Sequence, residues 1–109
     1  MDFDVINDSE GKLWFATKKG LAYFDSDHDA FISVDSFYGK FVEQISEASN
    51  GDFIVLADAK LYRYSYESKE AILFKNQPEG ISTFSLSNDG KIYAGTKQGE
   101  NLCPYIFRN

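Results

Sequence analysis

The chain has 109 residues and a net charge of −6, from 17 acidic and 11 basic side chains, and 17% of its residues are aromatic. This length predicts one domain or less, and the aromatic content favours strands, because flat and β-branched side chains suit a half-buried pleated surface. The acidic balance argues against nucleic-acid binding, which needs a basic stripe. No long apolar stretch and no basic, apolar leader is visible, so we expect a soluble chain without a membrane segment or signal peptide in these residues.

A nine-residue pattern occurs three times along the chain. Each copy has two polar residues, a glycine and a run of apolar residues, and the glycines are Gly11, Gly51 and Gly90. They lie 40 and 39 residues apart. This spacing is typical of β-propellers, which are built from four-stranded antiparallel units of about 40 to 50 residues.

Eleven strands are predicted from these copies. In chain order they cover residues 5–8, 13–17, 21–25, 30–34, 44–48, 53–57, 61–65, 71–74, 83–87 and 92–96, followed by a last strand through Leu102 and Pro104. Asn50-Gly51 and Asp89-Gly90 predict tight hairpins between the first two strands of a copy, because both dipeptides tolerate positive φ. Residues 36–46 contain Gly39 and are expected to connect two copies, with one turn of helix.

The number of units predicts a partial propeller. The second strand of each copy is a continuous apolar run, which indicates that neighbouring sheets cover both of its faces. We expect one all-β domain over 1–109, with units at about 1–41, 42–81 and 82–109, or about 2.7 blades. Because closed propellers have at least roughly four blades, we expect exposed apolar faces and an edge strand at Pro104. The expected partners are the remaining blades of a longer propeller or a second copy of the chain.

Residues 5–25 resemble the two-component regulator propeller repeat. The likeness consists of an apolar pair, Asp8, the Gly11 turn, Leu-Trp-Phe-Ala-Thr at 13–17, and Gly20-Leu21 followed by an aromatic residue. The third copy lacks the tryptophan, and the second has Ala57 in place of the threonine. Such repeats occur in the extracytoplasmic sensor domains of hybrid two-component histidine kinases, many of which detect oligosaccharides in gut bacteria.

The resemblance implies a periplasmic or extracytoplasmic sensor segment that responds to a carbohydrate, with an oligosaccharide as partner. It carries no catalytic residue and no cofactor onto this chain, and we expect none. Two alternatives stay open. Related propellers include lyases, for which His28 or a tyrosine would be the base, and no feature of the sequence argues strongly against a protein-interaction scaffold.

Three polar features receive structural interpretations. Residues 25–36 imitate a calcium loop, but Ala30 replaces the required glycine and Ser36 the bidentate glutamate, so a solvated hairpin turn is the better interpretation and no metal site is expected. His28 lies in that turn without a positioned partner for acid or base catalysis. Cys103 is a lone cysteine without a basic neighbour and is expected to be a small buried hydrophobe.

Aromatic residues are the remaining candidates for ligand contact. Tyr62, Tyr64 and Tyr66 alternate, so they project from one face of a strand. Most aromatic residues are expected to fill the layers between units. Tyr38 and Tyr66, which lie near loops, are the two candidate ligand-binding residues. Lys69 and the other charged residues of the turns are expected to be solvated.

Overall fold

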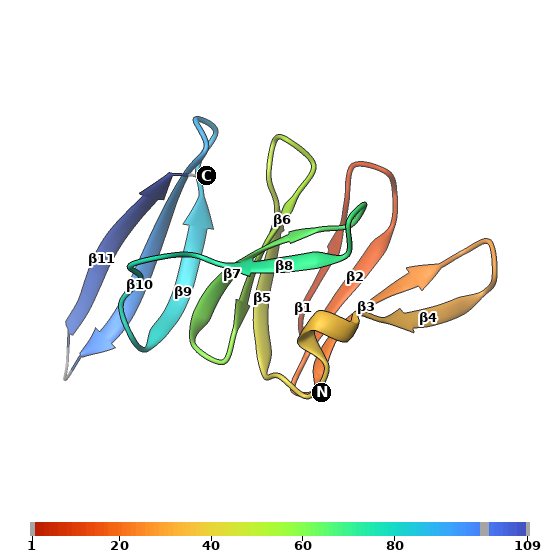
Figure 1. The fold of residues 1–109 in the computed structure, drawn as a ribbon, viewed down its shortest axis with the longest axis horizontal. Coiled ribbons are helices and arrows are strands. Elements are labelled where there is room, and N and C mark those ends of the chain that lie inside the picture. Colours follow the sequence, from red (N-terminus) through yellow and green to blue (C-terminus); the bar gives the residue numbers. More distant parts are fainter. Residues whose placement is uncertain (1, 99–100, 109) are drawn as a thin grey trace.

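The computed structural model describes the backbone of residues 2–98 and 101–108 and the side chains of residues 4–96. Three antiparallel sheets stand side by side along the long axis of the molecule (Figure 1). The first sheet contains β1 (Asp2–Asn7), β2 (Leu13–Thr17), β3 (Gly20–Asp25) and β4 (Ala30–Ser33). The second contains β5 (Val42–Glu47), β6 (Phe53–Ala57), β7 (Lys60–Ser65) and β8 (Glu70–Leu73). The third contains β9 (Ile81–Leu86), β10 (Lys91–Gln98) and β11 (Asn101–Arg108).

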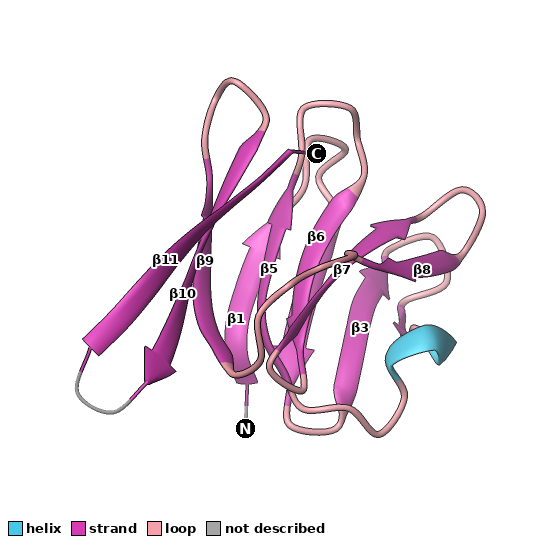
Figure 2. Ribbon diagram, turned by 60° about the vertical axis from the view of Figure 1, so that its left-hand side comes forward, coloured by secondary structure: helices cyan, strands magenta, loops and turns pink. Residues whose placement is uncertain are grey.

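Within each sheet, strands that follow one another in the chain are neighbours. The predicted all-β fold of antiparallel, four-stranded units is therefore confirmed, with β11, which contains Pro104, at the edge of the third sheet. The first strands of the sheets, β1, β5 and β9, run next to one another (Figure 2). In the part of the chain that the structure describes, no helix is long and apolar enough to span a bilayer.

The first and second strands of each sheet are joined by short hairpin loops, as predicted. Between β1 and β2, the Gly11 N–H donates to the Asp8 carbonyl at 3.0 Å and the Asp8 N–H to the Lys12 carbonyl at 2.9 Å, so five residues form the connection. The equivalent turn of the second sheet has positive φ only at Gly51. Two consecutive residues with positive φ occur instead at Asp58 and Ala59, between β6 and β7. The predicted short turns at Asn50-Gly51 and Asp89-Gly90 are present, but only the glycine of each dipeptide has positive φ, because a β-turn followed by one left-handed glycine closes these loops.

The predicted connection at residues 36–46 is half correct. A single 3₁₀ turn, η1 (Asp35–Phe37), supplies the expected helical turn, but β5 already begins at Val42. Gly20, the first residue of β3, has φ 145° and contacts the backbone of η1. A Cβ at this position would lie only 3.0 Å from the Phe37 carbonyl oxygen. Glycine is therefore required where the connection crosses the first sheet.

Two apolar cores lie between the three sheets. The first includes Trp14, Ala16, Leu21, Val34, Phe37, Val42, Ile45, Phe53, Val55, Ala57 and Tyr64, and the second includes Ile54, Leu56, Leu61, Ile81, Phe84, Ile92 and Ala94. All five residues of β6 are buried, because a sheet covers each face of this strand. In β2 only Trp14 and Ala16 are buried, and Tyr93 in β10 is 41% exposed. Coverage of both faces is therefore correct for β6 and wrong for β2 and β10.

Side chains at equivalent positions of β1 and β5 hydrogen-bond the backbone of the next sheet. Asp4 in β1 accepts a bond from the Ile45 N–H in β5 at 3.2 Å. Gln44 holds the equivalent position in the second sheet, because it precedes Gly51 by seven residues as Asp4 precedes Gly11. Its side chain accepts a bond from the Phe84 N–H at 3.1 Å and donates one to the Phe84 carbonyl at 2.6 Å. These side chains fix the height at which one sheet stacks on the next.

Candidate functional site

A polar groove crosses the end of the three sheets at which β1–β2, β5–β6 and β9–β10 are connected. These loops are at the top of Figure 1. A cleft of about 520 Å³ lies between the first two sheets, and a cleft of about 450 Å³ lies mainly between the second and third. The two clefts share Ser9, Glu47 and Gly51. We call them together the turn groove, and volumes of this size are typical of sites for small ligands.

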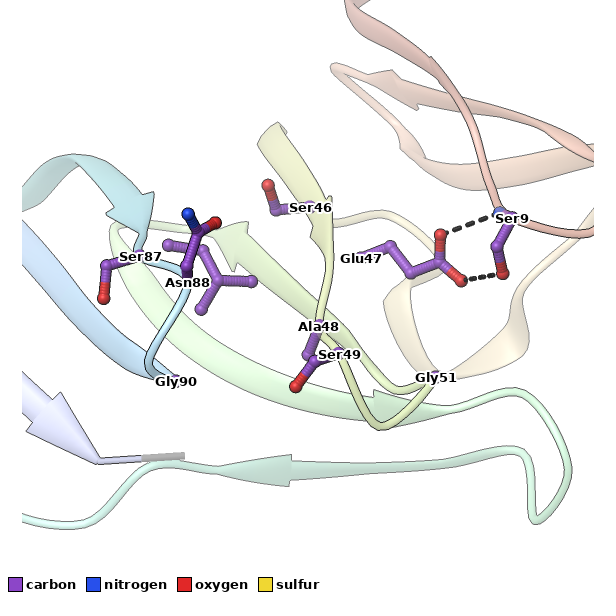
Figure 3. Close-up of a pocket in the computed structure, with 10 residues that line it drawn as sticks. Ser9, Ser46, Glu47, Ala48, Ser49, Gly51, Ser87, Asn88 and Gly90 are labelled. Atoms are coloured by element: carbon purple, nitrogen blue, oxygen red, sulfur yellow. Dashed lines mark hydrogen bonds between the residues drawn. The ribbon is translucent and has the colours of Figure 1, made fainter.

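Glu47 links the first two loops of the turn groove. Its carboxylate accepts from the Ser9 N–H at 2.8 Å and from the Ser9 hydroxyl at 2.7 Å. Figure 3 shows this pair beside Ser46, Ser49 and Asn88, which line the cleft. Charge-assisted bonds of this kind are among the stronger ones in proteins, so Glu47 holds the Ser9 loop of one sheet against the next.

Asp8 supports the floor of the cleft between the first two sheets. The carboxylate is 9% exposed and accepts from the Trp14 indole at 2.9 Å. It also accepts from the backbone N–H groups of Glu10 and Lys12 at 2.9 and 2.8 Å. Asp8 therefore shapes its own loop and anchors Trp14 in the first core.

Tyr66 forms one wall of the same cleft. The ammonium groups of Lys12 and Lys69 lie 4.0 and 3.4 Å from the centre of its ring, within the range of cation–π attraction. The neighbouring Tyr23 hydroxyl, followed by Lys12, lowers the pKa of Tyr66. Burial, followed by the Tyr66 hydroxyl, raises the pKa of Tyr23 to about 12. Lys69, expected to be only solvated, is exposed but also packs on an aromatic ring.

The cleft between the second and third sheets is lined mostly by small polar side chains and backbone. Ser46, Ser49, Ser87 and Asn88 contribute hydroxyl and amide groups. The Ser87 hydroxyl bonds the Asp89 carboxylate within its own loop. This set offers both donors and acceptors to a ligand with many hydroxyl groups.

The structure separates the two predicted ligand-binding residues. Tyr66 lines the turn groove, whereas Tyr38 follows η1 and is 80% exposed. The Gly39 N–H donates to the Lys19 carbonyl at 2.8 Å, which places this segment at the β2–β3 turn, at the opposite end of the first sheet. The two tyrosines therefore cannot contribute to one small site.

The residues of the calcium-like turn act within the turn itself. Asp25 accepts from the Asp27 N–H at 3.0 Å and approaches His28 Nδ1 at 2.8 Å, and the bond with His28 lowers the pKa of Asp25. The His28 side chain is 78% exposed. No group of three or more His, Cys, Asp or Glu side chains that could hold a metal occurs among the described residues. Cys103 pairs with Thr96 in the backbone ladder, but its side chain is outside those that the structure describes.

Two parts of the groove were missed by the sequence reasoning. Ser9 and Glu47 are 38 residues apart, and Lys12 and Tyr66 come from different sheets, so no local motif marks either contact. The repeat could have predicted where the groove lies. When equivalent sheets are stacked in order, the loops that contain Gly11, Gly51 and Gly90 lie at the same end.

Comparisons with known proteins support the fold. No family model matches the sequence, and no curated protein matches it. Two crystal structures share the arrangement, both of extracellular domains of putative hybrid two component systems from B. thetaiotaomicron. The domain of BT4673 has a TM-score of 0.80 at 17% identity and is matched over 100% of this chain. The domain of BT3049 has a TM-score of 0.75 at 18% identity, over 98% of this chain. The chain spans only 15% of either, so the similarity confirms the predicted resemblance at the level of the fold.

Proposed function

We propose that this chain is a ligand-binding segment of an extracytoplasmic sensor, that it responds to a carbohydrate, and that it is not catalytic by itself. It would act as one domain of three units, at about 1–41, 42–81 and 82–109. Both similar structures are extracellular domains of putative hybrid two component systems, which supports a sensor in an extracellular location. The turn groove is the single observation that carries the proposal, because it combines a suitable volume with many hydrogen-bonding groups.

The charges in the groove favour a neutral oligosaccharide. Glu10, Glu47, Asp52 and Glu67 line the cleft between the first two sheets, and Lys12 is its one basic lining residue among those described. Carboxylates accept hydrogen bonds from sugar hydroxyls, whereas they repel an anionic ligand. Tyr66 adds an aromatic side chain with a hydroxyl group to the wall of the cleft.

Calorimetric titration with a panel of neutral oligosaccharides tests the proposal. We expect binding by the unmodified chain and about tenfold weaker binding by Tyr66→Ala, a loss of roughly 1.4 kcal/mol. Tyr38→Ala is the matched control, because it removes a tyrosine from the opposite end of the sheet. Binding that depends on Tyr38 instead would place the ligand at that end, and no binding to any member of the panel would contradict the proposal.

One observation favours a lyase as a second candidate. The pKa of Tyr66 is lowered by the neighbouring Tyr23 hydroxyl and by nearby lysines, and a tyrosine with a lowered pKa is better suited to remove a proton. Such an enzyme would act on a uronate-containing polysaccharide and leave an unsaturated product, although the carboxylates that line the cleft disfavour an anionic substrate. Ultraviolet detection of that product, lost in Tyr66→Phe, would support this candidate; no product from several uronates would exclude it.

A further inference from the structure

The first sheet has an exposed apolar face on the side turned away from the second sheet. We call it the trailing face, and it consists of Val5, Leu13, Phe15, Phe24 and Phe31. Val5 is 49% and Phe31 66% exposed. The Phe31 ring packs edge-on against Phe15 and Phe24, with centroids 5.3 and 5.2 Å away. An exposed aromatic cluster of this kind is a candidate contact surface.

The equivalent residues of the second sheet show what such a face packs against. Relative to the glycine of each repeat, the trailing face of the first sheet corresponds to Ile45, Phe53, Val55, Tyr64 and Ala71. All five belong to, or pack on, the core between the first and second sheets. The same sequence positions are therefore buried wherever another sheet precedes them.

The side of the third sheet that points away from the second sheet is the other half of this repeated interface. We call it the leading face. Tyr93 holds the position of Trp14 and Ile54, which both enter the core toward the following sheet. It is 41% exposed, as expected of a leading face without a follower. Thr83 holds the position of Asp4 and Gln44, the residues that bond the backbone of the next sheet.

We propose that two copies of this chain associate head to tail, with the leading face of the third sheet of one copy packed on the trailing face of the first sheet of the other. The contact would continue the stacking already present between the sheets. Because it joins two different faces, it is heterologous, and such contacts form a closed ring when the rotation permits. Two copies contain six sheets, within the roughly four to eight of closed propellers.

Known contacts predict which residues meet across the new interface. The Trp14 and Phe53 rings have centroids 4.5 Å apart across the first core. Their equivalents at the new interface are Tyr93 of one copy and Leu13 of the other. A cysteine at each of these two positions would therefore face the other between copies.

The experiment combines mass and cross-linking. For the unmodified chain we expect a mass by light scattering of twice the 12.4 kDa of one chain. Phe31→Ser should have the mass of a monomer. Ile72→Ser is the control and should remain a dimer, because it changes an apolar, 57% exposed residue outside the trailing face. In a Cys103→Ser background, a short bismaleimide should join Leu13→Cys chains to Tyr93→Cys chains only when the two are mixed.

Three outcomes would overturn the proposal. Cross-linking of Leu13→Cys chains to one another would show a face-to-face dimer. A monomeric mass for the unmodified chain throughout a dilution series would show that no second copy binds. Retention of the dimer by Phe31→Ser would place the contact elsewhere.

Discussion

Replacing Asp8 tests how the first loop is built. Asp8→Ala removes the acceptor for the Trp14 indole, which is fully buried, and for two backbone N–H groups of the loop. A buried donor left without a partner costs about 1 to 3 kcal/mol, whereas the loop N–H groups can turn to water at a smaller cost. We expect the free energy of unfolding to fall by about 2 to 3 kcal/mol.

The second repeat supplies a matched comparison. There Ala48 stands at the position of Asp8 and Ile54 at that of Trp14, so the carboxylate and the indole are replaced together. In a Trp14→Phe background, Asp8→Ala should therefore cost only about 1 kcal/mol, which is a coupling of about 1 to 2 kcal/mol between the two side chains.

Urea unfolding followed by circular dichroism at constant protein concentration measures both quantities. Glu10→Ala, in the same loop but at an exposed side chain, is the control and should change stability by less than about 0.5 kcal/mol. The reasoning is refuted if Asp8→Ala costs no more than this control, or if its cost is the same with and without the indole.

Three further predictions concern the turns and the tyrosines. Ala59→Gly should raise stability by about 0.5 to 1 kcal/mol, because Ala59 has φ 62° and glycine adopts this conformation without steric cost; lower stability in urea would contradict it. Gln44→Ala should speed hydrogen exchange of the Phe84 amide, whose acceptor it removes, and an unchanged rate would show that this bond is not maintained. Tyr23→Phe removes the hydroxyl that lowers the pKa of Tyr66, so spectrophotometric titration should find a higher pKa for Tyr66, and an unchanged value would exclude Tyr23 as the cause.

The repeat made the strands and their stacking predictable. Spacing between Gly11, Gly51 and Gly90 set the length of a unit, and the apolar runs after each glycine located β2, β6 and β10. Turn chemistry was less informative, because Asp58-Ala59 forms the two-residue turn with positive φ without any glycine. Strand pairing on both sides imposes that conformation against the local preference of alanine.

The candidate site was only partly predictable. Tyr66 was selected because it lies near a loop, and the structure places it in a groove, but its lysine neighbours could not be inferred. Lys12 reaches it from another sheet, and Lys69 comes from a turn that the sequence marks only as charged. Contacts between stacked sheets depend on their relative height, which the bonds from Asp4 and Gln44 determine and no local pattern records.

Amide chemical-shift mapping with a neutral oligosaccharide tests the central claim, that the turn groove binds a carbohydrate. The account predicts that the largest shifts occur at the three glycine loops, with Ser9, Glu47 and Asn88 among them. Shifts confined to the opposite end, around Tyr38 and the β2–β3 turn, or no shifts with any saccharide of the panel, would contradict it.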